Sequence, residues 1–233
     1  FLMPGYLPPY KSFCSRFEKP IVQEEDQTAV RRLNQLTGPF ILRRMKSDVL
    51  KELPPKTENV YRIELEEEQR KLYLAAVVDA REKLQAAKPE DKMAVFAVLM
   101  RLREICCDPR LIADNWEGGS AKLDACVELV SSAVEGGHRI LLFSQFTSML
   151  ELLAKRLDAE GISHFTLQGS TPKPVRAELV RRFNGGEVSV FLISLRAGGT
   201  GLNLTAADIV IHYDPWWNVA AQNQATDRAY RIG

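Results

Sequence analysis

From residue 120 onward, strand-like runs alternate with amphipathic segments, and this alternation limits the fold more than any other feature of the chain. RILLFS shows no polar alternation, which suits a strand that is covered on both faces. The strand-like runs are RILLFS (139–144), HFTLQG (164–169), VSVFLIS (188–194) and DIVIHYD (208–214). Helical patterns lie at 120–134, 146–159, 174–184 and 218–230. The alternation predicts an α/β fold with a parallel sheet between helices.

Ligands of such sheets bind at the carboxyl ends of the strands. The loops after residues 144, 168, 194 and 214 should therefore carry the chemistry.

The first half of the chain has a different organisation. Residues 1–38 are rich in proline, aromatic and charged residues, which indicates an arm that packs on something else. Residues 39–118 read as a helical region, and the sheet domain should occupy 119–233. Within the helical region we expect helices at 39–51, 66–85 and 93–107 and a short strand at 61–65.

The bulk numbers exclude few functions. The chain has 31 Lys and Arg against 30 Asp and Glu, so a basic surface must be local. Four cysteines without metal-ligand spacing favour reduced thiols in an intracellular protein, and we expect no metal site. No apolar run approaches the ~20 residues that span a bilayer, so we expect no membrane partner. The chain lacks an initial methionine and ends in a helical pattern, which indicates a piece of a longer protein.

The loop LRAGGTGLN after residue 194 suits an anion. Glycines let the backbone approach a ligand and present N–H groups to it, although a plain tight turn is the alternative. The loop is not a dinucleotide fingerprint, because Leu204 stands where the third glycine belongs. The chain holds no Gly-Lys pair and therefore no phosphate-binding Walker loop.

Gln224, Arg228 and Arg231 have the spacing of one helix face. Two stacked guanidinium groups repel unless an anion lies between them, and their geometry matches phosphate oxygens. Pairing of Arg231 with Asp227 is the alternative reading. The glycine loop earlier in the same sheet favours the anion site, and with a γ-phosphate these arginines would be arginine fingers.

Two further loops could carry function. Pro215 to Asn218 contains two tryptophans, of which one could be exposed, and Asn218 could cap the next helix. The loop Gly169 to Lys173 with Arg176 combines hydroxyls, a helix start and a guanidinium, which suit a phosphate contact. An ordinary helix cap is the alternative there.

Several stretches together resemble the second half of the Swi/Snf-type ATPases, DNA translocases related to superfamily-two helicases. The stretches are FILRRMKSDVLKELPPKTE, LREICCDPRL, ILLFSQFTSML, LQGSTPKPVR, LISLRAGGTGLNLTAADIVIHYDPWWN and QATDRAYRIG. FLMPGYLPPYKSFCSRFEKPI resembles the tail of that family's first lobe. The resemblance covers nearly the whole chain.

The resemblance implies a RecA-like second lobe with a helical extension before it and no phosphate loop of its own. ATP and Mg²⁺ would be held mainly by the first lobe, which precedes this one in the same polypeptide. Arg228 and Arg231 match the family's fingers and Gln224 the polar residue that leads them. The resemblance also implies nucleotide contacts at Gly199, Thr200, Gly201 and Asp227.

The resemblance further implies contacts to the phosphate backbone of double-stranded DNA. The matching residues are Gly169, Ser170, Thr171, Arg176, Ser194, Arg196 and Trp217. Arg43 and Arg44 fall in a brace helix that couples the lobes. Residues 1–38 would be the tail of the first lobe and 39–118 the linker and brace. The chain departs from the family pattern at Gln168, Arg196, Val219 and Tyr230.

We therefore expect the second motor lobe of a DNA-dependent ATPase that is inactive when isolated. We expect it in the cytoplasm or nucleoid of a prokaryote or in the nucleus of a eukaryote. The alternative is a non-catalytic DNA- or protein-binding module derived from such a lobe, which would need no fingers. A free-standing Rossmann-type enzyme is a third reading, and the missing third glycine argues against it.

Overall fold

The computed structural model describes residues 5–42, 56–86, 92–198 and 202–229. The chain divides into two compact units, Phe1–Pro54 and Pro55–Gly233. The predicted helix at 39–51 falls largely outside the described residues. Within the described ranges, no helix combines the length and apolar character that crossing a bilayer requires.

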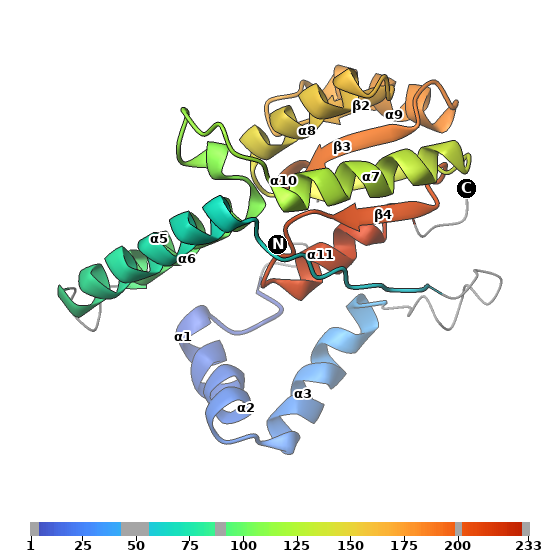
Figure 1. The fold of residues 1–233 in the computed structure, drawn as a ribbon. Coiled ribbons are helices and arrows are strands. Elements are labelled where there is room, and N and C mark those ends of the chain that lie inside the picture. Colours follow the sequence, from blue (N-terminus) through green and yellow to red (C-terminus); the bar gives the residue numbers. More distant parts are fainter. Residues whose placement is uncertain (1–4, 43–55, 87–91, 199–201, 230–233) are drawn as a thin grey trace. The chain divides into compact units, whose positions relative to one another are not determined.

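The second unit is built on a four-stranded sheet in the order β2-β3-β1-β4, in which every strand pair is parallel. This confirms the α/β prediction. The strands are β1 (Ile140–Ser144), β2 (His164–Leu167), β3 (Val190–Ser194) and β4 (Ile209–His212). Figure 1 shows them between layers of helices, namely α7 (Ala121–Glu135), α8 (Thr147–Ala159), α9 (Lys173–Asn184), α10 (Leu195–Gly198) and α11 (Val219–Thr226).

Alternate side chains of the central strands enter two separate cores. Ile140 and Leu142 of β1 lie in one core with buried residues of α7 and α8, such as Val130 and Leu153. The other core contains Leu141 and Phe143 of β1 and, from the helices, Phe183 of α9, Ala197 of α10 and Ala225 of α11. The period of two along a strand thus produces a sheet that is covered on both faces.

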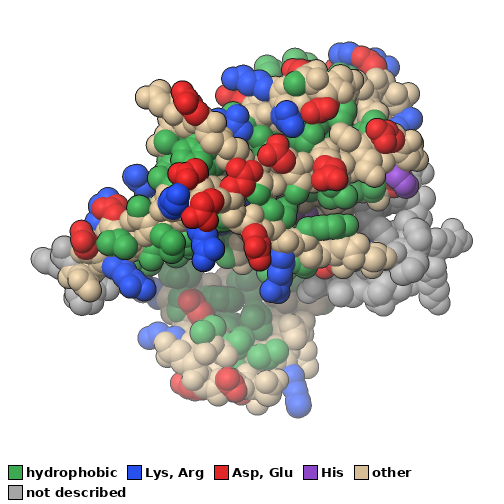
Figure 2. Space-filling view, viewed as in Figure 1, with side chains coloured by type: hydrophobic (Ala, Val, Ile, Leu, Met, Phe, Trp, Pro, Cys, Tyr) green, Lys and Arg blue, Asp and Glu red, His purple; other side chains and the backbone are tan. Residues whose placement is uncertain are grey.

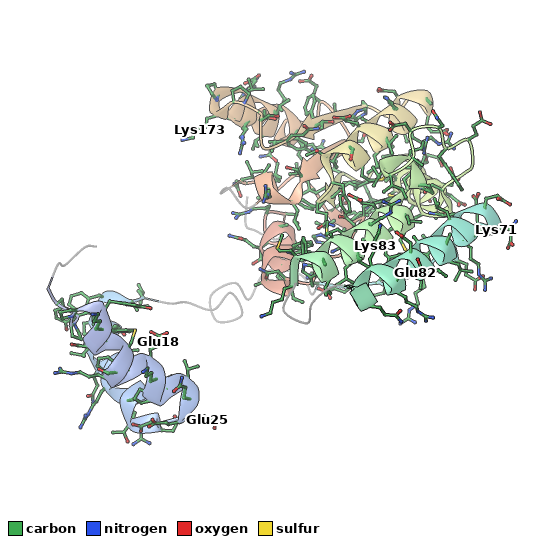
Figure 3. The ribbon with its side chains drawn as sticks, turned by 90° about the vertical axis from the view of Figure 1, so that its left-hand side faces the viewer. Glu18, Glu25, Lys71, Glu82, Lys83 and Lys173 are labelled. Atoms are coloured by element: carbon green, nitrogen blue, oxygen red, sulfur yellow. The ribbon has the colours of Figure 1, made fainter. Side chains whose placement is uncertain are left out.

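A hairpin of α5 (Glu67–Ala86) and α6 (Lys92–Cys107) precedes the sheet and ends in a 3₁₀ turn, η3 (Pro109–Leu111). Gln69 fastens the two helices, since its side-chain Nε2 donates to the Ile105 carbonyl at 2.8 Å. Lys71, Glu82 and Lys83 mark the length of α5 in Figure 3. Many apolar side chains of the hairpin, including Phe96 and Leu99, are half exposed because two helices alone bury little surface.

The first unit contains α1 (Tyr10–Phe13), a π-helical turn η1 (Cys14–Glu18), α2 (Lys19–Gln23), α3 (Gln27–Thr37) and a 3₁₀ turn η2 (Gly38–Phe40). Pro9 precedes the first helix, as expected for a proline-rich start. Asp26 caps α3 by accepting from the Thr28 N–H at 2.7 Å. Phe17 and Ala29 form its small buried centre.

The structure corrects two sequence predictions. Residues 61–65 do not form a strand: they have no ladder partner among the described residues, and Tyr61 is exposed. The helix predicted at 218–230 ends at Thr226 and is followed by a turn. The reason is local, because the N–H groups of Arg228 and Ala229 bond to carbonyls three residues back rather than four.

Candidate functional site

The loops that the sequence singled out begin at one edge of the sheet. Ser144 pairs with Ser194, Phe143 with His212, and Leu167 with Ile193. Because all four strands run in one direction, the segments after residues 144, 168, 194 and 214 leave from the same carboxyl edge. This is the edge at which parallel sheets bind ligands.

Arg228 lies in the turn after α11 and its side chain is only 5% exposed. Its carbonyl accepts from the Leu204 N–H at 3.0 Å, and its own N–H donates to the Ala225 carbonyl at 3.1 Å. The backbone of Arg228 is thereby joined to the residues that follow the glycine loop. Gln224 is exposed on α11. Because α11 ends at Thr226, Gln224 does not share a continuous helix with Arg228 as the spacing predicted.

The third member of the predicted face, Arg231, lies outside the described residues, as do Gly199, Thr200 and Gly201. Asp227 is half-buried beside Arg228, and its N–H donates to the Asn223 carbonyl at 2.9 Å.

The segment around the glycine loop is held at both ends. Ser194 is buried, and its Oγ accepts from the Ala197 N–H at 3.4 Å, which starts α10. Arg196 is exposed on that helix. Beyond the loop, the Asn184 side chain donates to the Asn203 carbonyl at 2.9 Å and accepts from the Ala206 N–H at 3.4 Å.

The turn after β4 presents an aromatic pair to solvent. Trp217 is 48% exposed, and its ring lies 4.9 Å from Trp216 and 5.7 Å from Phe96 of α6. Arg103 of α6 places its guanidinium 4.8 Å from the Trp217 ring and donates to the Pro215 carbonyl at 2.8 Å. The predicted exposed tryptophan is therefore held by a residue far away in the sequence.

Asp214 fixes the start of the same turn. Its carboxylate accepts from the Gln145 N–H at 3.0 Å and lies 4.0 Å from the Arg103 guanidinium. Burial raises the pKa of Asp214, whereas hydrogen bonds from Ser144 and the Gln145 N–H and the charge of Arg103 act in the opposite direction. This carboxylate joins the carboxyl ends of β4 and β1.

The loop after β2 is held by a side chain of its own and by one from the helix that follows it, α9. Thr171 Oγ1 accepts from the Gln168 N–H at 3.1 Å. Arg176 donates through Nε to the Thr171 carbonyl at 2.8 Å and through a terminal nitrogen to the Gly169 carbonyl at 2.8 Å. Ser170 is exposed, and Lys173 projects from the first turn of α9 (Figure 3). Arg176 thus holds the conformation of the loop and also gives it a positive charge.

Sequence reasoning missed four residues that hold the segments leaving this edge: Arg103, Asn184, His212 and Asp214. Two of them carried a signal, since Arg103 lies among apolar residues of a helix and His212 ends an otherwise apolar strand. A polar side chain within an apolar pattern is buried only with a partner. The partners themselves lie 14 to 112 residues away, as for His212 with Thr226 and Arg103 with Pro215.

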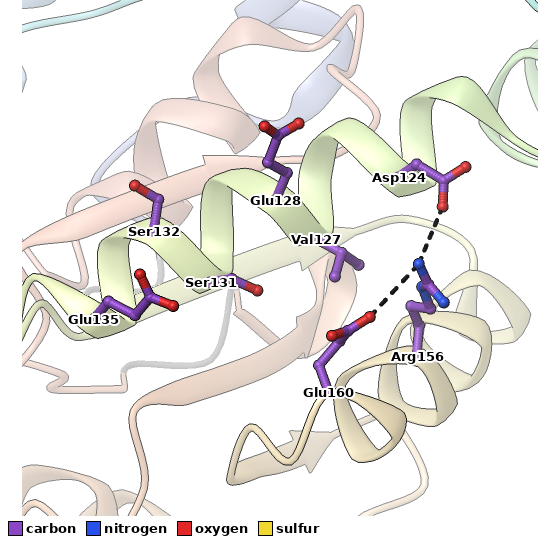
Figure 4. Close-up of a pocket in the computed structure, with 8 residues that line it drawn as sticks. All are labelled: Asp124, Val127, Glu128, Ser131, Ser132, Glu135, Arg156 and Glu160. Carbon is purple, nitrogen blue, oxygen red and sulfur yellow. Dashed lines mark ion pairs between the residues drawn. The ribbon is translucent and has the colours of Figure 1, made fainter.

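Hollows elsewhere on the second unit do not involve the predicted residues. One of about 360 Å³ lies between α7 and α8, where Arg156 pairs with Asp124 and Glu160 at 3.5 Å (Figure 4). Figure 2 shows acidic and basic side chains interspersed over the same face. In the described part of the chain, no group of three or more His, Cys, Asp or Glu side chains could hold a metal ion.

Comparisons with known proteins identify the protein family to which the chain belongs. Residues 1–111 match the SNF2-related domain, and residues 121–233 match the helicase conserved C-terminal domain. The fold and the two matches define a RecA-like lobe of the helicase C-terminal type. The chain belongs to the SNF2 (Swi/Snf-type) ATPase family, of which it carries the second, RecA-like lobe.

Individual relatives are consistent with this family assignment. The chain is 37% identical over 238 residues to an uncharacterized ATP-dependent helicase of Mycoplasma genitalium and 39% identical over 242 residues to a putative ATP-dependent helicase/translocase of Bacillus subtilis. Both alignments cover 100% of this chain but only 22% and 26% of the relatives. The SWI2/SNF2 ATPase core of Sulfolobus solfataricus, solved in complex with dsDNA, matches 98% of this chain with a TM-score of 0.68 and 31% identity, and the match covers 49% of that structure.

Proposed function

We propose that this chain is the second motor lobe of an ATP-dependent translocase of double-stranded DNA. The observation that carries the proposal is Arg228, a buried arginine on the segment that follows β4, whose backbone is bonded to Leu204 just after the glycine loop. A cation fixed before the reaction stabilises transition-state charge without reorganisation. Such a cation fits the γ-phosphate of a nucleotide held by another lobe.

In this proposal ATP and Mg²⁺ are held mainly by a first RecA-like lobe of the same polypeptide. Residues 1–38 are its tail, residues 39–118 the linker and brace with Arg43 and Arg44, and residues 119–233 the second lobe. Arg228 and Arg231 act as arginine fingers, with Gln224 before them. The backbone at Gly199, Thr200 and Gly201, together with Asp227, completes the nucleotide contacts from this side.

The second part of the proposal concerns duplex DNA. The exposed Ser170, Arg196 and Trp217 support it, because all three lie on segments that leave the same edge of the sheet. With Gly169, Thr171, Arg176 and Ser194 they would contact the phosphate backbone, which makes binding independent of sequence and sensitive to salt. A DNA partner places the protein in the nucleoid region of a prokaryote or in a eukaryotic nucleus.

The test compares two proteins, residues 1–233 alone and the longer polypeptide that includes the preceding phosphate loop. ATPase turnover is measured with and without duplex DNA. We expect turnover only in the longer protein and stimulation by the duplex. In the longer protein, Arg228→Ala should lower turnover by about 10³–10⁵ and leave DNA affinity nearly unchanged.

Two outcomes would decide against the proposal. Normal turnover of the Arg228→Ala protein would remove the finger assignment. A longer protein that binds duplex DNA but never turns over ATP would favour the non-catalytic binding module instead.

A further inference from the structure

A half-buried histidine joins β4 to the end of α11. His212 Nε2 lies 2.8 Å from Thr226 Oγ1, and the same hydroxyl donates to the Gln222 carbonyl at 3.3 Å. The imidazole stacks on Phe143 of β1, with ring centroids 5.4 Å apart and planes 19° from parallel. The ring is therefore held by packing while its outer nitrogen reaches the helix.

The two contacts of the Thr226 hydroxyl indicate which ring nitrogen of His212 carries the hydrogen. A threonine hydroxyl has a single hydrogen, and here it is directed to the Gln222 carbonyl. With the hydrogen so directed, we infer that His212 donates its Nε2–H to Thr226 Oγ1, which corresponds to the neutral tautomer with a bare Nδ1. Burial, and next the charge of Lys56, lower the pKa of His212 to about 4, while Glu58 acts in the opposite direction. The neutral donor thus persists at physiological pH.

The contact lies two residues before Arg228, at the point where α11 ends. Two other bonds hold the same segment: the Trp216 N–H donates to Gln222 Oε1 at 3.3 Å, and the Leu204 N–H donates to the Arg228 carbonyl at 3.0 Å. The helix is therefore fastened to the strand before it, to the tryptophan turn and to the residues after the glycine loop. Of these attachments, only the one from His212 to Thr226 runs between two side chains.

We propose that His212 and Thr226 are positioning residues that set where α11 ends and so where the guanidinium of Arg228 points. This inference rests on the proposed function, because the contact between His212 and Thr226 can affect catalysis in this way only if Arg228 acts on the nucleotide. A finger acts in the transition state, so a displaced finger lowers kcat rather than substrate binding. A misplacement of about 1 Å costs on the order of a hundredfold in rate.

The experiment uses the two-lobe protein with three substitutions. Thr226→Val keeps the shape of the side chain and removes the hydroxyl, whereas Thr226→Ser keeps the hydroxyl. His212→Phe keeps the stacking on Phe143 and removes the donor. We expect kcat to fall about tenfold to a hundredfold in Thr226→Val and in His212→Phe, with KM for ATP and affinity for duplex DNA within about twofold of the parent. Thr226→Ser should restore kcat to within about threefold.

A spectroscopic measurement supports the kinetics. The ¹⁵N shifts of the His212 ring in residues 1–233 should report the Nε2–H tautomer at neutral pH, and in Thr226→Val the exchange of that proton with solvent should be faster. A ring protonated on Nδ1 instead would overturn the inference.

The kinetic outcomes separate the positioning role from the proposed function. Unchanged kcat in Thr226→Val, measured well below its melting temperature, overturns the positioning role and leaves only a contribution to stability. A loss of kcat that Thr226→Ser does not restore also overturns it. If Arg228→Ala turns over normally, the proposed function itself fails; if Arg228→Ala is inactive while Thr226→Val matches the parent, only this inference fails.

Discussion

β2 and β4 are the two outer strands of one sheet, and the segments that follow them are held in opposite ways. After β2, the turn is held locally, by Thr171 within it and by Arg176 of α9, the helix that follows it. After β4, the segment is held by other elements: β1 through the Gln145 N–H, α6 through Arg103, and the residues after the glycine loop through Leu204.

The difference matches two kinds of task. A loop whose bonds lie within residues 168–176 can shift with less effect on the sheet than a segment bonded to several elements, which suits a contact to a DNA backbone that is read without regard to sequence. A segment that several elements hold keeps its charges in place, which suits transition-state stabilisation. Arg176, on the segment after β2, should therefore affect mainly DNA binding. Arg228, on the segment after β4, should affect mainly the rate of ATP hydrolysis.

The largest expected effect tests the arginines directly. In the two-lobe protein, Arg228→Lys should lower ATPase turnover by about 10²–10³, because lysine keeps the charge but loses the planar fork that matches phosphate oxygens. The matched variant Arg176→Lys should change turnover less than tenfold. Steady-state ATPase assays at saturating ATP and duplex DNA measure the turnover of both variants. Equal losses of turnover would show that the segments after β2 and β4 do not differ in this way.

A second prediction compares how firmly the two segments are built. Asp214→Ala removes the acceptor of the Gln145 N–H and leaves Arg103 without its carboxylate, so the free energy of unfolding should fall by about 2–3 kcal/mol. Thr171→Val removes one partly buried acceptor and should cost about 1 kcal/mol. Urea unfolding of residues 1–233 measures both values. A larger loss in Thr171→Val would show that the β2 side is the more firmly held.

Much of this architecture could be predicted from the sequence. The continuous apolar runs RILLFS and VSVFLIS, and the helices between the strand-like runs, predict a parallel sheet and hence one functional edge. The sequence failed where a local pattern competed with tertiary bonds. YRIEL has strand-like residues but no partner strand, and the pattern of α11 continues past Thr226 although the Arg228 carbonyl bonds to the Leu204 N–H.

The candidate site was less predictable than the fold. Arg228 and Trp217 could be found because they stand in recognisable blocks of sequence. Their supports, Arg103 and His212, could not be assigned, because a hydrogen bond between residues 14 or 112 positions apart leaves no periodic signal. A buried polar residue predicts that a partner exists and does not say which residue it is.

The most gradual expected effect concerns the pH dependence that His212 brings to the β4 side. Burial lowers the pKa of His212 to about 4 in the folded chain, against about 6.5 in an unfolded chain. Between these values the unfolded chain binds a proton that the folded chain does not. The free energy of unfolding should therefore fall as the pH drops from about 6.5 to 4, by roughly 1 kcal/mol per pH unit from this group.

Other groups titrate in the same range, so the contribution of His212 is obtained as a difference. His212→Phe lacks the titrating imidazole but keeps an aromatic ring against Phe143. The parent should be the more stable protein at pH 7, where the bond to Thr226 is intact, and its advantage should shrink steadily toward pH 4. Urea unfolding of both proteins at several pH values measures this difference. Parallel curves would show that the imidazole is not buried in its neutral form, and the hydrogen bond from Nε2 to Thr226 would lose its physical basis.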